Sequence, residues 1–204
     1  METTLSGHVL EGSHVVLEPI GVGHAPVLFA AADPSCVTYH PARPDEWTIQ
    51  GFARYIDSMT ADANRAAYLV RLCEDGTVVG TTSFLDIRPA HRGVEIGATW
   101  IGSLWRGTIV NPQMKLLMLE LAFERWCAIR VQLKCDARNV QSQRAIERLG
   151  ARREGVLRQH MVLADGFVRD TVMYSIIASE WPAIRNGLHE RIHGLEGQAR
   201  GVHD

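Results

Sequence analysis

The chain has 204 residues, of which 46% are hydrophobic and 22% are charged, so it can bury a sizeable core and has the composition of an ordinary soluble globular protein. Its formal net charge of −2 gives no reason to expect nucleic acid or an anionic membrane as a partner. No apolar run approaches the roughly 20 residues that span a bilayer, and the first residues lack the basic and apolar segments of a signal peptide. We therefore expect a cytoplasmic protein with a single domain over residues 1–193 and a flexible tail over 194–204.

The cysteines have no paired spacing such as C-x-x-C. There are four of them: Cys36, Cys73, Cys127 and Cys135. Isolated thiols of this kind are typical of a reducing compartment and give no pattern for a disulfide framework or a metal site. We expect reduced, mostly buried thiols and no metal cofactor.

Hydrophobic periodicity and turn residues predict strands and helices that alternate along the chain. The expected strands are 14–20, 67–73, 77–85, 94–101, 131–135, 155–163 and 167–177. The expected helices are 25–32, 48–61, 112–127, 139–149 and 179 to about 192. This order indicates an α/β protein of mixed α+β character, with one mixed sheet of about seven strands and helices on both of its faces.

The junction between the strand 94–101 and the helix that follows predicts an anion-binding site. Asn111 suits the N-cap position, and Pro112 suits the first helical position, where a missing N–H costs nothing. A strand that turns directly into a helix leaves several N–H groups unpaired at the positive end of the helix dipole. Such an end is a common binding site for phosphate.

Later segments of the chain resemble a known family. The helical motif reads Asn139-x-x-Ser142-x-Arg144-x-x-Glu147-x-x-Gly150, and the following strand contains Glu154-Gly155-x-x-Arg158. Arg106 occupies the first position of a [Q/R]-x-x-G-x-[G/A] loop, whose two small positions are taken by Ile109 and Asn111. Together, from about residue 10 to 182, these segments resemble the GNAT superfamily of N-acetyltransferases, in the branch similar to the ribosomal-protein acetyltransferases RimJ and RimL.

The resemblance implies a fold, a co-substrate and a reaction. The fold is a mixed, mostly antiparallel sheet with a V-shaped splay after the fourth strand. The reaction transfers an acetyl group from acetyl-CoA to a primary amine, on a protein N-terminus or a small molecule, by direct attack in a ternary complex. A homodimer is a common assembly of similar proteins. The implied cofactor-binding residues are Trp100, Ile101, Arg106, Gly107, Thr108, Ile109, Val110, Asn111, Lys115, Asn139, Ser142 and Arg144.

Two residues are candidates for catalysis. Glu95 lies eleven residues before Arg106, the offset at which the histone-acetyltransferase branch carries its catalytic base. The alternative is a structural or substrate-binding role, because a glutamate on a strand often pairs with a basic residue of a neighbouring strand. The tyrosine that many members use as the acid falls at Ile146 and is absent here. Ser142 matches the serine near the CoA sulfur, or it completes a helix cap with Asn139.

Three further sets of residues have alternative interpretations. Lys115, in the first helical turn, opposes the helix dipole unless a phosphate lies nearby, so it contacts CoA or is solvated on a polar face. Arg144 and Arg148 suit the 3′-phosphate of CoA or plain solvent. His160 and Asp170 are expected on the acceptor side as substrate-binding residues.

Two alternative functions stay open at this stage. The absent tyrosine and the loop without the glycines of its two small positions also suit a degenerate GNAT fold that binds CoA or a partner without catalysis. The remote alternative is a zinc peptidase, because His189-Glu190-x-x-His193 spells a zinc-binding helical motif. That reading needs a third ligand, and few residues follow His193.

Overall fold

The sheet has eight strands and is antiparallel except at one pairing. The structure, a computed structural model, describes residues 4–200, with side chains up to Gln198. The strand order is β1-β2-β3-β4-β5-β6-β8-β7. The strands are β1 (Leu10–Glu11), β2 (Val15–Pro19), β3 (Ala66–Leu72), β4 (Val78–Arg88), β5 (Gly93–Ile101), β6 (Arg130–Asp136), β7 (Arg152–Val162) and β8 (Val168–Ile177). The predicted GNAT-type mixed sheet is confirmed, and the strand absent from the prediction is β1, which is too short to show a period.

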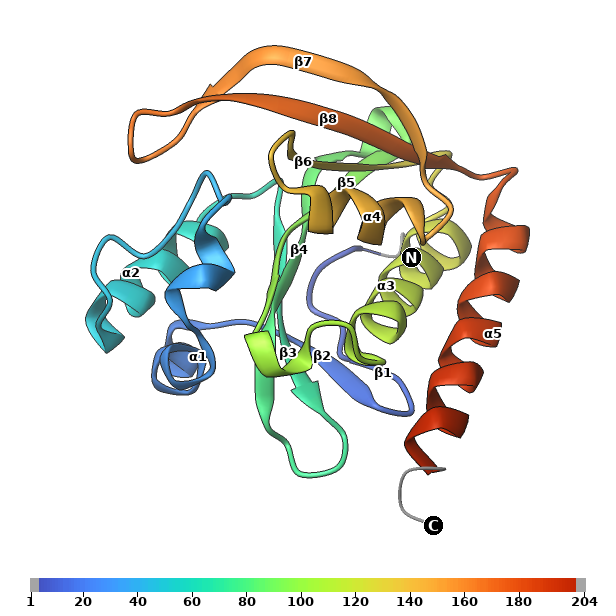
Figure 1. Cartoon of the computed structure of the whole chain (residues 1–204), viewed down its shortest axis with the longest axis horizontal. Helices are drawn as coiled ribbons and strands as arrows, with labels where there is room; N and C mark the ends of the chain where they lie inside the picture. Colours follow the sequence, from blue (N-terminus) through green and yellow to red (C-terminus); the bar gives the residue numbers. More distant parts are fainter. Residues whose placement is uncertain (1–3, 201–204) are drawn as a thin grey trace.

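Five α-helices cover the two faces of the sheet. They are α1 (Ala25–Ala31), α2 (Ile49–Thr60), α3 (Val110–Glu120), α4 (Val140–Glu147) and α5 (Trp181–Arg200). Figure 1 shows α1 and α2 on one face and α3, α4 and α5 on the other. Each face has its own buried cluster, with Phe52 and Ile56 in the first and Met114 and Met118 in the second. No helix among residues 4–200 is long and apolar enough to cross a membrane.

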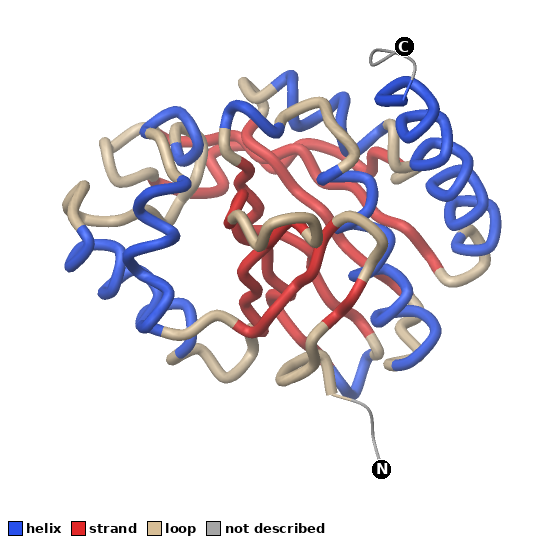
Figure 2. The backbone as a smooth tube through the Cα atoms, turned by 90° about the horizontal axis from the view of Figure 1, so that it is seen from below, coloured by secondary structure: helices blue, strands red, loops and turns tan. Residues whose placement is uncertain are grey.

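The sheet splays apart between β5 and β6. These two strands pair in parallel only from Gly93 to Glu95. Beyond Glu95, β5 contains a bulge, with a register shift against β4 and a φ of 46° at Ala98. Because a bulge bends its strand away from a regular ladder, the rest of β5 diverges from β6. The splay after the fourth predicted strand is thus confirmed, and the red strands of Figure 2 can be followed on either side of it.

Helix α3 begins two residues earlier than predicted. Its N-cap is Ile109, so Asn111 and Pro112 are the second and third helical residues rather than the cap and the first. Thr108 makes this start possible, because its Oγ1 accepts the Val110 N–H at 3.3 Å. Pro112 still lies in the first turn, where no backbone donor is required. The predicted helix 112–127 ends early as well, since Leu121–Arg125 form a π-helical turn and Cys127 has a φ of 59°.

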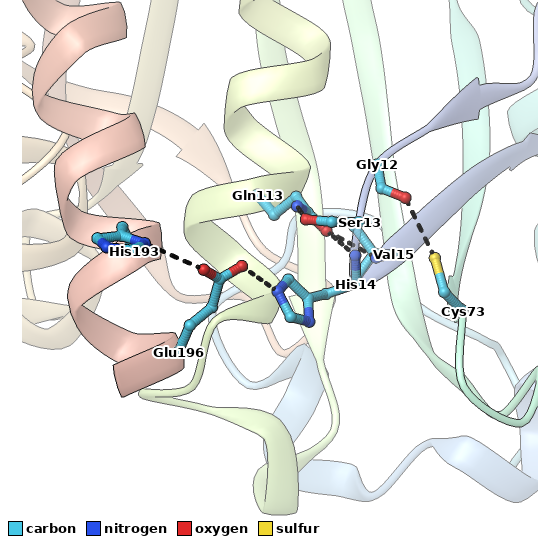
Figure 3. A network of polar contacts seen from close by, with 8 residues as sticks. All are labelled: Gly12, Ser13, His14, Val15, Cys73, Gln113, His193 and Glu196. Atoms are coloured by element: carbon cyan, nitrogen blue, oxygen red, sulfur yellow. Dashed lines mark hydrogen bonds and ion pairs between the residues drawn. The ribbon is translucent and has the colours of Figure 1, made fainter. Parts of the chain in front are cut away.

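Helix α5 extends past the end that the sequence predicts. Residues 194–200, expected as part of a flexible tail, are helical, and residues 201–204 lie outside the described part. Figure 3 shows the reason: Glu196 on this extension contacts His14 at 2.7 Å and His193 at 3.4 Å. In the same view, Gln113 of α3 accepts the backbone N–H of Val15 at 2.8 Å. The N-terminal strands are therefore held by both α3 and α5.

The cysteines only partly match expectation. All four are free, and Cys36 and Cys135 are buried. Cys73 and Cys127 are exposed, so the prediction of mostly buried thiols is wrong for half of them.

Candidate active site

A cleft of about 740 Å³ lies at the splay of the sheet. Its walls come from β5, β6, the start of α3, the helix α4 and the segment between α1 and α2. Single residues of β4, β7, β8 and α5 complete them, together with Arg65, which precedes β3. The predicted site residues that line it are Glu95, Trp100, Ile101, Arg106, Gly107, Thr108, Asn111, Lys115, Asn139 and Ser142. Residues from distant parts of the sequence therefore meet in one cavity.

Five predicted site residues do not line this cleft. Val110 is buried in the core, Ile109 packs against the core, and Arg144 is exposed on α4. His160 is exposed on β7, and Asp170 lies in a separate shallow depression, where its Oδ1 accepts the Gln159 N–H at 2.7 Å. For His160, a β-bulge between Leu157 and Met161 displaces the side chains that a regular strand would present. Asp170 faces away because side chains alternate along β8 and its neighbour Arg169 lines the cleft.

We call the helix starts on one side of the cleft the donor arm, comprising residues 106–112 and 139–142. The backbone N–H groups of Gly107, Thr108 and Ile109 have no hydrogen-bond acceptor within the described residues. Gly107 has a φ of 80° and open space beside its Cα. Asn139 caps α4 as predicted, since its Oδ1 accepts the Ser142 N–H at 2.9 Å. The donor arm thus offers free backbone donors at the start of an eleven-residue helix.

The Arg106 side chain fixes this loop in place. Its Nε donates to the Ile101 carbonyl at 3.1 Å, and its Nη2 donates to Ser35 Oγ at 3.1 Å. Ser35 belongs to a short 3₁₀ turn, η2 (Pro34–Val37), on the opposite side of β5 from α3. The guanidinium therefore acts in the structure as a tie between the loop and η2.

Glu95 lies at the apex of the splay with one oxygen held and one free. Its side chain is 3% exposed. Oε2 lies 3.0 Å from Lys134 Nζ and accepts a hydrogen bond from Gln132 Nε2 at 3.0 Å. Oε1 is buried with no partner among the described residues. A side chain at Gly97 would place its Cβ 2.9 Å from Oε1, so the glycine keeps room for the carboxylate. Glu95 therefore forms the predicted pair with a basic residue through Oε2, and it keeps Oε1 free to accept a proton.

Lys115 is buried rather than solvated, so that alternative is wrong. The residue is 6% exposed and lines the cleft, with Nζ donating to Thr99 Oγ1 at 2.9 Å. Burial lowers the pKa of its amine from 10.5 to about 7, because no carboxylate compensates the charge. An amine with such a pKa changes its protonation state near neutral pH. Through Thr99, the amine lies beside the bulge of β5.

Ser142 lies close to the thiol of Cys135. The pKa of Cys135 is raised to about 11, chiefly by burial, while a hydrogen bond from Ser142 opposes the shift. Both predicted roles of Ser142 remain open, since its backbone N–H is capped by Asn139 and its side chain lines the cleft.

Several cleft residues have no signal in the sequence. Arg191 of α5 lines the cleft, and the pKa of its guanidinium is lowered by burial and by the nearby charge of Arg148. The opposite wall carries Tyr39, His40, Arg65 and Arg169, which we call the acceptor arm. These residues come from three separate segments, so no local spacing connects them.

The zinc-peptidase motif does not assemble a site. His189 faces Glu120 at 3.8 Å, and His193 faces Glu196 at 3.4 Å. Among the residues described with side chains, no group of three or more His, Cys, Asp and Glu could hold a metal ion. Arg191, between the two histidines, turns toward the cleft instead.

Comparison with known proteins gives the class. The sequence model of the acetyltransferase (GNAT) domain matches residues 14–152. A GCN5-related N-acetyltransferase from Brucella melitensis is 30% identical and superposes with a TM-score of 0.84, covering 91% of this chain and 85% of that one. "Putative ribosomal N-acetyltransferase YdaF" of Bacillus subtilis is 28% identical over 155 residues, or 76% of this chain and 78% of the relative. Mycobacterium smegmatis RimJ in complex with CoA-disulfide shares the fold, with a TM-score of 0.75 at 21% identity over 90% of this chain and 91% of that one.

The splayed sheet and the matched domain together define an N-acetyltransferase. The chain belongs to the GNAT family of acetyltransferases and is similar in sequence to "Putative ribosomal N-acetyltransferase YdaF". GNAT acetyltransferases use acetyl-CoA, so the cleft can be tested for its fit to that co-substrate.

Proposed function

We propose that this protein transfers an acetyl group from acetyl-CoA to a primary amine, on a protein N-terminus or a small molecule, by direct attack in a ternary complex. One observation carries the proposal: the unpaired N–H groups of Gly107 and Thr108 and the free Oε1 of Glu95 belong to residues that line the same cleft. The first can bind a phosphate, and the second can accept a proton.

The residues of the donor arm fit CoA. The N–H groups of Gly107, Thr108 and Ile109 suit the pyrophosphate, which needs donors and no side-chain charge. Arg148 and Arg191 bring two like charges near each other without an ion pair to any described residue, which favours a phosphate between them. They replace Arg144 as our candidates for the 3′-phosphate.

Bound acetyl-CoA supplies an activated thioester, and the residues at the splay handle the protons. The acceptor must be a neutral amine when it attacks, so Glu95 Oε1 takes its proton directly or through a water. Lys134 and Gln132 orient that carboxylate by holding Oε2. The bulge at Ala98 leaves strand N–H groups outside the regular ladder, and Lys115 places an amine beside it. Both are suited to stabilise negative charge on a carbonyl oxygen.

Ser142 is our candidate for protonating the departing thiolate. It lies at the start of α4, where the helix dipole favours negative charge nearby. Its hydroxyl lines the cleft, and the tyrosine of other members is replaced here by the buried Ile146. The same replacement supports the second candidate function, a GNAT fold that binds CoA without catalysis.

Steady-state release of CoA separates these candidates. Acetyl-CoA would be offered with peptides that have a free α-amine, with the same peptides acetylated at the N-terminus but carrying a lysine, and with small amines. We expect saturable CoA release and a product heavier by one acetyl group with at least one class. Binding of CoA by calorimetry with no acetylated product in any class would favour the degenerate protein.

A further inference from the structure

The guanidinium of Arg169 is buried in the acceptor arm with too few partners. The residue is 3% exposed on β8 and lines the cleft. Its Nη1 donates to the Tyr39 carbonyl at 3.3 Å, while its Nε is buried with no acceptor among the described residues. Burying a charged group in this state is costly unless an opposite charge compensates it.

A second guanidinium reaches the same wall from the residue just before β3. Arg65 precedes β3, and its Nε and Nη2 both donate to one hydroxyl, Ser83 Oγ, at 3.2 and 3.0 Å. Burial lowers the pKa of this guanidinium, as it does for Arg169. Neither arginine forms an ion pair with any described carboxylate.

The carboxylates nearest to Arg169 are already paired with other cations. Glu95 is held by Lys134 at 3.0 Å, and Asp136 binds Arg138 through both of its oxygens, at 3.0 and 2.7 Å. Arg138 is also stacked on the Phe167 ring at 3.4 Å, which fixes that pair in place. Because these carboxylates are paired with other cations, they compensate Arg169 only from a distance, and Arg65 likewise feels Asp62 without forming an ion pair with it.

The buried imidazole of His40 lines the cleft together with the guanidinium groups of Arg65 and Arg169. Its Nε2 lies 3.1 Å from the Thr99 carbonyl, so this nitrogen carries the proton and donates it. The pKa of His40 is lowered to about 4, first by burial and then by the charges of Arg169 and Arg65. Both arginine charges act on this one buried imidazole, so the three side chains belong to one part of the cleft.

We propose that this part of the cleft is a binding site for a carboxylate of the acceptor substrate, held by Arg169 and Arg65. The assignment to the acceptor rests on the proposed acetyl transfer and on position. Tyr39 and His40 precede α2 on the sheet face opposite the donor-arm helices α3 and α4. A carboxylate matches the planar fork of a guanidinium and supplies the missing charge. The preferred acceptor thus carries a carboxylate near its reactive amine, as in a peptide with an acidic first residue or a free amino acid.

Paired acceptors that differ only in this group test the proposal. Peptides that begin with Asp and Asn, or with Glu and Gln, and amino acids paired with their amides, would be compared with acetyl-CoA as the donor. We expect the wild-type protein to favour at least one carboxylate member by about tenfold or more in kcat/KM, mainly through KM, because leaving a buried ionic site unpaired is costly. In Arg169→Gln the preference should fall to about twofold or less, because the carboxylate member loses more of its kcat/KM than the amide member does.

Controls separate a specific site from a general effect of charge. Arg158→Gln removes an exposed arginine of β7 outside the cleft and should keep the full preference. Arg169→Lys should keep part of it, because the positive charge remains without the fork. If Arg169→Gln does not fold, as judged by thermal unfolding, Arg65→Gln provides the same comparison.

A binding measurement provides a readout that does not depend on turnover. The NMR titration of the His40 imidazole, assigned with His40→Gln, would be recorded with acetylated carboxylate and acetylated amide products. We expect the carboxylate product alone to raise the pKa of His40, because it screens both arginines.

The outcomes distinguish this inference from the proposed function. Equal use of carboxylate and amide acceptors, with no change in Arg169→Gln, overturns the inference and leaves the acetyl transfer intact. A preference that depends on Arg169 only when succinyl-CoA replaces acetyl-CoA assigns the carboxylate to the acyl chain and overturns its assignment to the acceptor. No turnover with any acceptor refutes the proposed function itself.

Discussion

The donor arm and the acceptor arm of the cleft are built in different ways. The donor arm uses backbone N–H groups at the starts of α3 and α4, where local turns and caps create the site. The acceptor arm uses charged side chains that meet only because β3, β8 and the segment before α2 converge. A site made of backbone tolerates changes in side chains, as Ile109 and Asn111 demonstrate in the loop. A site made of distant side chains is specific to one protein and can define its own substrate.

The largest effect is expected where the two arms meet. Glu95→Gln should lower kcat by roughly 10² or more, because the amide cannot accept a proton from the amine. Stopped-flow or steady-state assays of CoA release would measure this loss of kcat. Asp170→Asn is the matched carboxylate-to-amide control outside the cleft. If Glu95→Gln keeps a rate close to that of Asp170→Asn, Glu95 has only the structural role.

Lys115 tests whether burial at the junction of the arms costs stability. Its folded pKa of about 7 lies below the ordinary 10.5, so between these values the unfolded chain binds a proton that the folded chain does not. The loss of unfolding free energy caused by burying the Lys115 amine is therefore fully present below pH 7, and it disappears as the pH rises toward 10.5. Lys115→Met should raise the free energy of unfolding by roughly 4 kcal/mol at pH 7 and by about 1 kcal/mol at pH 10. Denaturant unfolding at both pH values would show this, and an equal change at both would contradict it.

Phosphate binding by the donor arm can be tested with two substitutions of Gly107 that differ only in charge. Asp and Asn both tolerate the positive φ of Gly107 and differ only in charge. Gly107→Asp should weaken CoA binding by about tenfold more than Gly107→Asn at low salt, because it places a carboxylate beside the pyrophosphate. Calorimetric titration with CoA gives both constants. Equal affinities for the two variants would show that the phosphates bind elsewhere.

The smallest effect concerns the cap of α4. Asn139→Ala removes the acceptor for the Ser142 N–H and should cost about 1 kcal/mol of unfolding free energy. Asn139→Asp keeps an acceptor and should cost less. Thermal unfolding of the pair measures the difference, and a larger loss in the Asp variant would mean that the amide nitrogen has a role of its own.

Local signals predicted the fold and much of the donor arm. Alternating strands, the Asn139 cap and the Gly150 stop depend on neighbours in sequence, and the structure reproduces them. The start of α3 was misplaced because Thr108 supplies the acceptor that the sequence assigned to Asn111. The extension of α5 was missed because it depends on Glu196 reaching His14, far away in the sequence.

The acceptor arm could not be predicted from local spacing. Arg65 and Arg169 are separated by about half the chain, and each resembles an ordinary solvated arginine in its own segment. The substrate-binding residues that the sequence suggested, His160 and Asp170, lie outside the cleft. The bulge in β7 displaces His160, and side chains alternate along β8, so Arg169 rather than Asp170 lines the cleft. The burial of Lys115 was hidden for a similar reason: a lysine on a helix is most often exposed.

Amide hydrogen exchange with and without CoA tests the two-arm account most directly. The account predicts that CoA slows exchange at the amides of residues 107–110 and at the start of α4, and leaves the segment of Tyr39 and His40 unchanged. A carboxylate-bearing acceptor product should then slow exchange near Tyr39 and His40 instead. Protection by CoA around Tyr39 and His40, with none at residues 107–110, would contradict the account.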